Sequence, residues 1–458
     1  MTTTKAATSP TSTLERRLGP YDAAAIIVAN VIGGGILFFP PQIASNTPQT
    51  WAFLSTWVAG GLLAFCGAMA YAELAALRPR AGGEYVYLRE AYGSLVGFLT
   101  GWTSFVAGFA GAMAASAMVI PLYLDRFVPG AASSAPWLRI PIPYIPVTIS
   151  NQTILAIVTV WILAFVHIRG VGPGRALSNG LTILKVGSLL LFIALGLTMG
   201  GTTGGGQQAA GEVTGTGWLL ALIVVMFVYS GWNAAAYMAE EVRDPGRNLP
   251  LALALGTAAV TLIYLLINVL YLWVIPIGEL VTVKGSVLDV AAERLLGARA
   301  GDIMGVISII SLLASVNAMT FAGPRVYFAM ARDGLFFPAA SHVHPTYKTP
   351  STSIAAQAAW ATVLVLTGSL DALGNYVGFA ITLFAGIAVA AVFVLRARDP
   401  QAPRPFKAVG YPVTPAIFVL FSLVMVVNAI YREPRVTGLG LLVIGAGIPL
   451  YLWFKSRR

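Results

Sequence analysis

Three consecutive glycines, Gly33 to Gly35, lie inside the apolar stretch "NVIGGGILFFP", which begins at Asn30. A glycine in a helix interior costs about 1 kcal/mol relative to alanine, so three together favour an unwound backbone. An unwound segment ends one half-helix and begins another, which leaves bare carbonyls and bare N–H groups beside a positive dipole end. The N–H groups suit a carboxylate, and the carbonyls suit an ammonium group. These residues therefore predict a site for an α-amino acid.

A second apolar stretch is interrupted in the same way. In "FVYSGWNAAAYMAEE", residues 227–241, the run from Tyr229 to Asn233 breaks the hydrophobic pattern in mid-span. Broken helices persist in hydrocarbon only where they line a cavity enclosed by protein or filled with water. Interrupted spans in corresponding positions of two halves are typical of a transporter's binding site near the bilayer midplane. The alternative for the glycines alone is close helix packing.

One charged residue lies inside an apolar span. Lys185 occurs within "NGLTILKVGSLLLFIALGL", residues 179–197. A lysine at mid-membrane costs roughly 2.5–3.5 kcal/mol on insertion scales, so it is a candidate functional residue. The alternative is snorkelling, in which the long side chain carries the ammonium group to the membrane surface.

The composition indicates the elements that must position these residues. Of 458 residues, 57% are hydrophobic and 10% are charged, whereas about a quarter of an ordinary soluble domain is charged. A hydrocarbon core needs roughly 20 apolar residues per helix. We expect an all-α integral membrane protein with about twelve transmembrane helices, near 22–44, 51–77, 94–123, 151–168, 178–199, 217–241, 249–276, 303–323, 351–369, 373–396, 411–431 and 436–454.

The net charge of +10 is spread unevenly between the two sides of the expected membrane. With twelve spans, 20 of the 28 lysines and arginines fall on the side that carries both termini and seven on the other side. Basic loops stay in the cytoplasm, so we expect a multi-pass protein of the plasma (inner) membrane with both termini cytoplasmic. This distribution argues against nucleic acid as a partner.

Few residues of the sequence could bind a metal or a cofactor or act in catalysis. The single cysteine, Cys66, excludes an internal disulfide and a cysteine-based metal cluster. The histidines are His167 at a helix end and His342 and His344 in a loop. We expect no metal, no cofactor and no catalytic residue, and nothing in the sequence requires a partner subunit.

Four motifs carry a family resemblance. "NVIGGGILFFP" resembles the first-helix motif of the amino acid–polyamine–organocation (APC) transporters. "YAELAALRPRAGGEYVYLREAYG", 71–93, and "FVYSGWNAAAYMAEEVRDPGRNLP", 227–250, resemble the L-amino-acid transporter (LAT) branch, and "GPRVYFAMARDGLFFP", 323–338, resembles its loop after helix eight. The resemblance implies a LeuT-like fold of inverted five-helix repeats, with helices 1 and 6 unwound, plus two extra helices.

This implied fold divides the chain into five parts. They are a flexible cytoplasmic tail at 1–20, a first five-helix repeat at 21–200, a second at 216–396, helices 11 and 12 at 405–454, and a tail at 455–458.

The resemblance also implies the contacts of the substrate. Its carboxylate would meet the backbone of the three glycines, and its ammonium group would meet carbonyls of the two unwound segments. Phe227 stands where relatives have an aromatic gate, and Gly34 stands where serine is common. The predicted substrate-binding residues are Val31, Ile32, Gly33, Gly34, Gly35, Phe227, Val228, Tyr229, Ser230 and Asn233.

Lys185 matches a lysine that, in sodium-independent relatives, replaces the cation of sodium-coupled relatives. The resemblance leaves two roles open, because a buried amine also releases its proton readily and can carry a coupling proton. Either role implies transport without sodium.

The function we expect is secondary active transport of neutral L-amino acids by alternating access, through exchange or proton coupling. Asn233 stands where relatives that handle cationic substrates often have a carboxylate. The alternatives are a polyamine or organic-amine transporter and, in another class, an ion channel, although the chain lacks a short repeated filter motif.

Charged residues follow the sixth span. Glu240 and Glu241 are followed by Arg243 and Arg247, so we expect either an ion-pair cluster that holds an inner gate or a solvated helix end.

Overall fold

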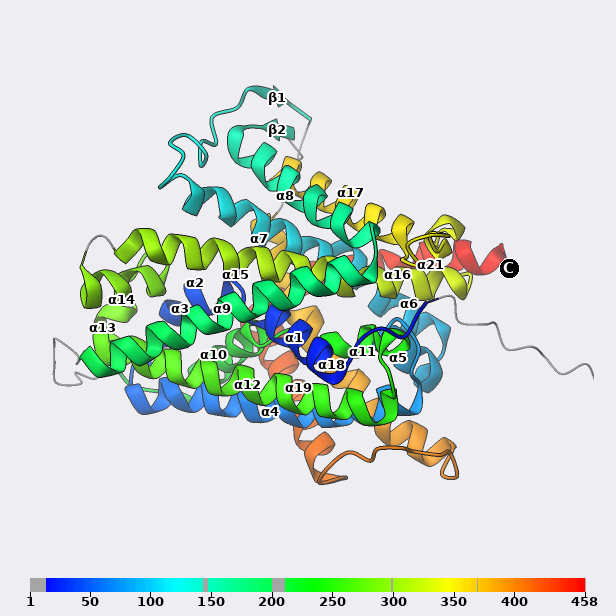
Figure 1. Cartoon of the computed structure of the whole chain (residues 1–458). Helices are drawn as coiled ribbons and strands as arrows, with labels where there is room; N and C mark the ends of the chain where they lie inside the picture. Colours follow the sequence, from blue (N-terminus) through cyan, green and yellow to red (C-terminus); the bar gives the residue numbers. More distant parts are fainter. Residues whose placement is uncertain (1–13, 143–146, 200–210, 298–299, 369, 458) are drawn as a thin grey trace, which may run out of the picture.

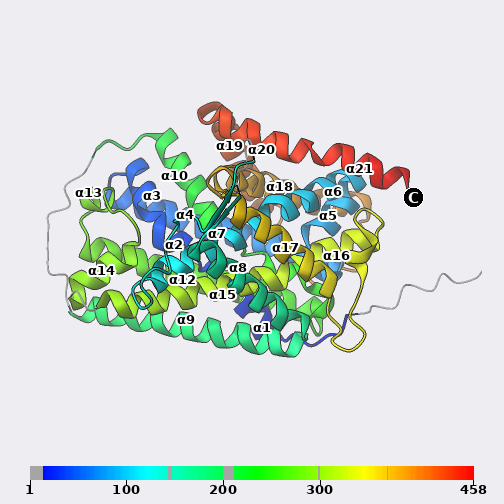
Figure 2. The ribbon, with the colours of Figure 1, turned by 90° about the horizontal axis from the view of Figure 1, so that it is seen from above.

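The computed structural model describes residues 14–142, 147–199, 211–297, 300–368 and 370–457. Long helices run side by side along one axis (Figure 1). Seen from above, α19 to α21 follow one edge and α9 follows the opposite edge (Figure 2). The described segment that leads into α1 (Pro20–Val31) and the C-terminal end of α21 (Gly447–Ser456) lie at one end of the bundle, called here the terminus end (Figure 1).

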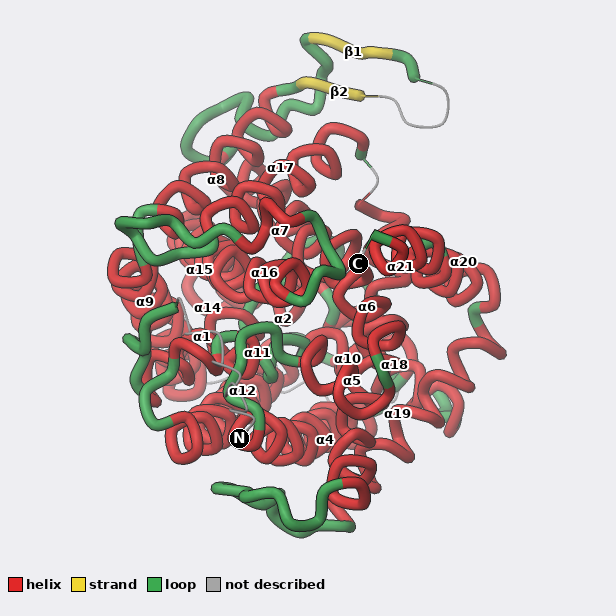
Figure 3. The backbone as a smooth tube through the Cα atoms, turned by 90° about the vertical axis from the view of Figure 1, so that its right-hand side faces the viewer, coloured by secondary structure: helices red, strands yellow, loops and turns green. Residues whose placement is uncertain are grey.

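The first part of the chain contains two short strands besides its helices. The strands, yellow in Figure 3, pair antiparallel, with Leu138 opposite Ile149. The elements are α1 (Pro20–Val31), α2 (Gly35–Phe38), α3 (Pro40–Asn46), α4 (Thr50–Leu77), α5 (Glu84–Tyr92), α6 (Ser94–Thr103), the π-helix η1 (Ser104–Gly108), α7 (Phe109–Leu124), β1 (Leu138–Ile140), β2 (Val147–Ile149), α8 (Asn151–Ile168) and α9 (Val171–Met199).

The second part is helical. Its elements are α10 (Gly215–Val228), α11 (Ala234–Tyr237), the 3-10 helix η2 (Ala239–Glu241), α12 (Pro245–Val274), α13 (Ile277–Leu280), α14 (Val287–Leu296), α15 (Ala300–Ala322), α16 (Pro324–Arg332), the 3-10 helix η3 (Pro338–Ser341), α17 (Ser351–Thr367), α18 (Leu370–Arg398), α19 (Val413–Arg432), α20 (Pro434–Gly445) and α21 (Gly447–Ser456).

Ten helical stretches of the described chain are long and apolar enough to cross a membrane. The two other expected spans are the shorter apolar helices α10 and α17. The first is short because the break after Val228 interrupts it, and the second ends at Gly368, which has a left-handed conformation. The prediction of an all-α membrane protein is confirmed, and the division into inverted repeats stays a prediction.

The N-terminal segment 14–19 is packed against the bundle. Residues 1–13 of the expected flexible tail lie outside the described residues, whereas Leu14 and Leu18 are buried. The backbone N–H groups of Arg17 and Leu18 donate to the Glu241 carbonyl at 2.9 and 3.0 Å, and Arg243 N–H donates to the Leu18 carbonyl at 2.9 Å. These backbone bonds join the start of α1 to the end of η2.

A cluster of ion pairs lies at the same end. Arg325 donates to both carboxylate oxygens of Glu241, at 2.8 and 3.1 Å, and Arg332 donates to Glu240 at 2.8 Å. The expected cluster therefore forms, but its arginines come from α16, while Arg243 and Arg247 are exposed. The arginines of α16 are seven residues apart, which places both on one face of that helix.

The pair formed by Arg325 and Glu241 generates a stability prediction. Both side chains are almost fully buried, at 1% and 0% exposure. The change Arg325→Met leaves the buried carboxylate without a cation, so we expect the free energy of unfolding to fall by about 3–5 kcal/mol. The measurement is thermal unfolding of the purified protein in detergent.

The control is Arg294→Met, which breaks a surface pair with Glu279 at 31% and 47% exposure. Such pairs contribute at most about 1 kcal/mol, so the control should unfold close to the wild-type temperature. Equal losses in the two variants would contradict the prediction.

Candidate functional site

The first break lies between α1 and α2. The first helix ends at Val31 and the next begins at Gly35, so residues 32–34 are not helical. Within the described chain, the N–H groups of Gly33, Gly34 and Gly35 have no hydrogen-bond acceptor. The predicted unwinding is confirmed, and it leaves three backbone N–H groups without a partner among the described residues.

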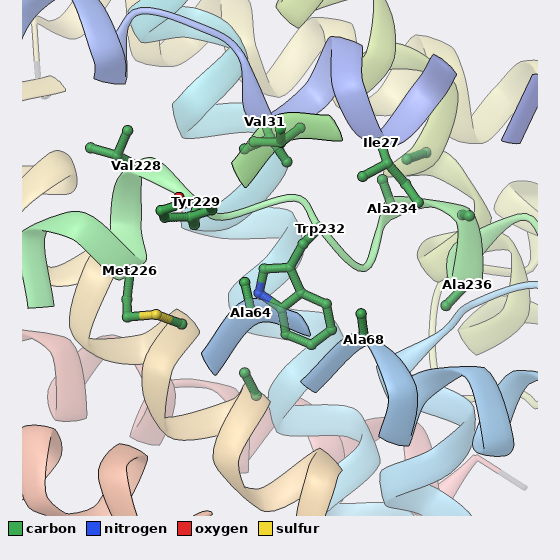
Figure 4. Close-up of a cluster of buried hydrophobic side chains, with 14 of the residues drawn as sticks. Ile27, Val31, Ala64, Ala68, Met226, Val228, Tyr229, Trp232, Ala234 and Ala236 are labelled. Atoms are coloured by element: carbon green, nitrogen blue, oxygen red, sulfur yellow. The ribbon is translucent and has the colours of Figure 1, made fainter. Parts of the chain in front are cut away.

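The second break lies between α10 and α11. Residues 229–233 form turns rather than helix, and Figure 4 shows this part of the backbone as a loop between Tyr229 and Ala234. Gly231 has φ +100°, a conformation that side chains rarely adopt. A Cβ atom there would collide with the side-chain amide of Asn30, so both the backbone and the space require glycine.

The two breaks touch each other. A Cβ atom on Gly35 would lie 3.3 Å from the Cα atom of Val228, so the two backbones are nearly in contact. Tyr264 of α12 joins them, because its hydroxyl lies 2.8 Å from the Val31 carbonyl and 3.2 Å from the Val228 carbonyl. A hydroxyl has one proton to donate, so it cannot satisfy both carbonyls fully.

Lys185, which lies in α9, forms hydrogen bonds to the backbone of the first break. Its side chain is fully buried, and its ammonium group donates to the carbonyls of Ala29, at 3.1 Å, and of Ile32. The lysine therefore does not snorkel to the membrane surface. Its positive charge lies where α1 ends and bare carbonyls concentrate negative partial charge.

Beside the breaks is a cavity of about 100 Å³. Its polar lining includes Asn30, Glu84, Thr100, Ser230 and Asn233. Oδ1 of Asn30 and Oγ1 of Thr100 are buried and have no hydrogen-bond partner among the described residues. Oδ1 of Asn30 is therefore available to a bound molecule, whereas Thr100 also faces Glu84.

A larger hollow of about 550 Å³ lies toward the end of the bundle opposite the terminus end. It lies between α3, α10, α18 and the connection from α19 to α20. Phe227 lines this hollow, and its ring meets the ring of Phe39 edge to face, at a centroid distance of 5.4 Å. Ser230, three residues further on, lines the smaller cavity instead. Phe227 therefore lies in the wall of the hollow, three residues before a residue that lines the smaller cavity.

The predicted site residues fall into three groups. Ser230 and Asn233 line the cavity, and Phe227 lines the hollow. The others form the two breaks or flank them and line neither space: Val31, Ile32, Gly33, Gly34, Gly35, Val228 and Tyr229.

Trp232, which is also part of the second break, is a core residue. It points toward Ala64 and Ala68 of α4 (Figure 4), and its ring packs edge to face against Tyr71 at a centroid distance of 4.8 Å.

Sequence reasoning missed three residues of the site. Tyr264 carries no signal, because a tyrosine in an apolar span is ordinary core. Thr100 is equally inconspicuous. Glu84 follows two glycines in the sequence, Gly82 and Gly83, but nothing in the sequence indicates that this acid reaches the second break.

No group of three or more His, Cys, Asp or Glu that could hold a metal occurs in the described ranges. His167 is buried, with Nε2 2.8 Å from Oδ1 of Asn317.

Comparison with known proteins identifies the family. The sequence model of the amino acid permease family matches residues 18–449. The chain belongs to the amino acid permease family. The human large neutral amino acids transporter small subunit 2 is 30% identical over 96% of this chain and 80% of its own length.

Two other permeases of this kind show similar identity. The serine/threonine exchanger SteT of Bacillus subtilis is 28% identical over 97% of this chain and 98% of its own length. The human b(0,+)-type amino acid transporter 1 is 30% identical over 93% of this chain and 84% of its own length.

The glycines of this permease differ in the space around them, which generates a prediction. A Cβ atom on Gly34 would meet its nearest neighbours at 3.6–3.8 Å, an ordinary contact, so Gly34→Ser fits. Its hydroxyl adds a donor for a carboxylate, and we expect KM for L-alanine to fall by about fivefold, corresponding to about 1 kcal/mol. Uptake into proteoliposomes measures KM.

The matched control is Gly34→Ala, which adds the Cβ atom without the hydroxyl. A second variant, Gly231→Ala, tests the conformation of the second break. We expect Gly34→Ala to leave KM near its wild-type value and Gly231→Ala to lower uptake more than about tenfold, because its strained φ alone costs about 1–3 kcal/mol. Wild-type uptake by Gly231→Ala would contradict this account of the second break.

Proposed function

We propose that this permease is a secondary active transporter of neutral L-amino acids that works without sodium by alternating access. The observation that carries the proposal is the contact between two unwound helices. The free N–H groups of Gly33 to Gly35 suit the substrate carboxylate, and the carbonyls of Val31, Phe227 and Ser230 suit its ammonium group. Each carbonyl oxygen has two lone pairs, so those that already accept one hydrogen bond still accept another.

The cavity supports a small, neutral substrate side chain. Its volume of about 100 Å³ is smaller than the roughly 150 Å³ of a protein cavity that binds benzene. The relatives named for serine and threonine, and for large neutral amino acids, are consistent with uncharged substrates.

A polyamine or another cationic substrate is the second candidate, because Glu84 lines the cavity. Its Oε1 already accepts hydrogen bonds from Tyr71 and Asn233, both at 2.6 Å. We therefore favour a neutral side chain. Competition of labelled L-alanine uptake by putrescine would favour the second candidate.

Lys185 supports transport without sodium. Its ammonium group donates to carbonyls of the first break, and a bound cation at the same place would accept the same oxygens as ligands. We propose that it is a fixed positive charge that replaces a cation there.

Alternating access requires a barrier on each side of the site. We propose that Phe227 closes the side toward the large hollow, and that the buried pair of Arg325 and Glu241 closes the terminus end. Following the excess of basic residues there, we propose that the terminus end is cytoplasmic and that the membrane is the plasma (inner) membrane. A membrane-impermeant thiol reagent would then label a cysteine placed at Lys284, but not one placed at Lys348, in intact cells.

The first test is exchange of L-alanine by the purified chain alone in proteoliposomes, in sodium and in choline buffer. We expect equal rates in the two buffers. Lys185→Ala removes the donor to the carbonyls of the first break, so we expect the rate to fall at least about tenfold, as from a loss of about 1.4 kcal/mol.

The controls separate charge from packing. Lys185→Met keeps an apolar side chain of similar length, and it should fail as Lys185→Ala does. Lys284→Met changes an exposed lysine outside the site and should transport normally. A steep dependence on sodium, or normal exchange by Lys185→Ala, would refute the proposal.

The same liposomes test the barrier at Phe227. We expect Phe227→Ala to bind L-alanine more weakly and to exchange it more slowly, because the edge-to-face contact with Phe39 is lost. Wild-type affinity and rate would exclude Phe227 as the barrier.

A further inference from the structure

Glu84 lies where the terminus end of the bundle meets the cavity. It is the first residue of α5 and is 8% exposed. Its carboxylate accepts from the Tyr71 hydroxyl of α4 and from the amide of Asn233, both at 2.6 Å. Asn233 is the last residue of the second break, so Glu84 is one hydrogen bond away from an unwound segment.

Glu84 differs from the other buried acids of the described chain. Four acidic side chains are buried there, and three of them have an arginine partner: Glu73 pairs with Arg396, Glu240 with Arg332, and Glu241 with Arg325. Glu84 forms no ion pair with any described residue. The nearby arginines of α16 are already occupied by the acids of η2.

The groups that face Glu84 are neutral. They are Tyr71 of α4, Tyr87 of α5 itself, Thr100 of α6, and Asn233 and Tyr237 at and in α11. On the side of α18, the cavity wall is apolar, with Ala380, Ile381 and Phe384. A tyrosine ordinarily ionises near pH 10, so none of these groups supplies a charge at neutral pH.

Two opposing effects act on the carboxyl group. An ionised carboxylate taken out of water without a cation costs several kcal/mol, while hydrogen bonds from the tyrosines and Asn233 favour the ionised form. Burial is the larger effect, and it raises the pKa of the Glu84 carboxyl above its ordinary value despite these hydrogen bonds. Glu84 therefore holds its proton at a higher pH than an exposed glutamate does.

The cavity connects this proton to the substrate. With the cavity empty, water can solvate the carboxylate from that side. A neutral side chain that fills the cavity displaces this water, removes solvation and makes ionisation less favourable still. Filling the cavity and protonating Glu84 therefore favour each other.

Resting on the proposed function, we propose that Glu84 is a proton-binding site coupled to occupancy of the cavity, so that one carboxylate oxygen takes up one proton from solvent when a neutral amino acid binds. By linkage, binding is tighter at low pH. Affinity falls, by up to about tenfold per pH unit, as pH rises between the pKa of the empty state and the higher pKa of the filled state.

The test is calorimetric titration of the purified transporter with L-alanine, from about pH 5 to about pH 9, a range that brackets a raised glutamate pKa. At each pH, two buffers that ionise near that pH and differ in ionisation enthalpy give the number of protons taken up per substrate. We expect up to one proton for the wild type within the window. For Glu84→Gln, which cannot ionise, we expect no uptake and an affinity that does not change with pH.

Two further variants complete the design. Glu212→Gln changes an exposed acid outside the site and should keep the wild-type proton uptake. Glu84→Asp keeps a carboxyl group on a shorter side chain, so it should retain the uptake with a shifted midpoint. This variant keeps the proposal testable if Glu84→Gln does not fold, because an unchanged midpoint in Glu84→Asp would overturn the proposal.

The remaining outcomes separate the two proposals. Wild-type protein that binds and exchanges L-alanine without proton uptake at any pH, or with proton release, overturns the role of Glu84 and leaves the proposed function intact. Wild-type proton uptake on substrate binding by Glu84→Gln also overturns the role of Glu84. A wild-type protein that exchanges none of a panel of amino acids overturns the proposed function itself.

Discussion

The structure depends on one constraint: backbone polar groups left unpaired in hydrocarbon must find partners. Each unsatisfied group costs several kcal/mol in a membrane, and this chain interrupts two helices side by side. The interruptions persist because α9, α12 and α15 surround them. Lys185 donates to two carbonyls of the first break, Tyr264 lies between carbonyls of both, and Ser315 lies against Gly33.

These partners leave backbone N–H groups unpaired in the first break. The stabilising contacts are directed mainly to carbonyls, whereas the N–H groups of Gly33 to Gly35 have no acceptor in the described chain. Under the proposed function, the substrate therefore supplies a group that accepts hydrogen bonds from these N–H groups. A carboxylate is such a group, because both of its oxygens accept hydrogen bonds.

The sequence predicted the breaks well because they are local. Glycines and polar residues in an apolar span have a physical cost that can be estimated without knowing their neighbours. The same reasoning located Lys185, because its charge is as conspicuous. It assigned the wrong arginines to the acids of η2, since Arg243 and Arg247 are near in sequence while Arg325 and Arg332 are near in space. Glu84 and Tyr264 were missed because the packing of distant helices brings them to the site, and no spacing along the chain encodes that.

The terminus end couples the two broken helices mechanically. Leu18 precedes α1 and pairs with Val242, which follows η2, so the half-helices below both breaks are joined by backbone hydrogen bonds. The buried pair of Glu241 and Arg325 then fastens this joined unit to α16. Each backbone bond contributes about 1 kcal/mol, whereas separating a buried ion pair costs several times more. Moving this joined unit away from α16 therefore requires breaking the Glu241–Arg325 pair, which is the largest single cost of opening this end.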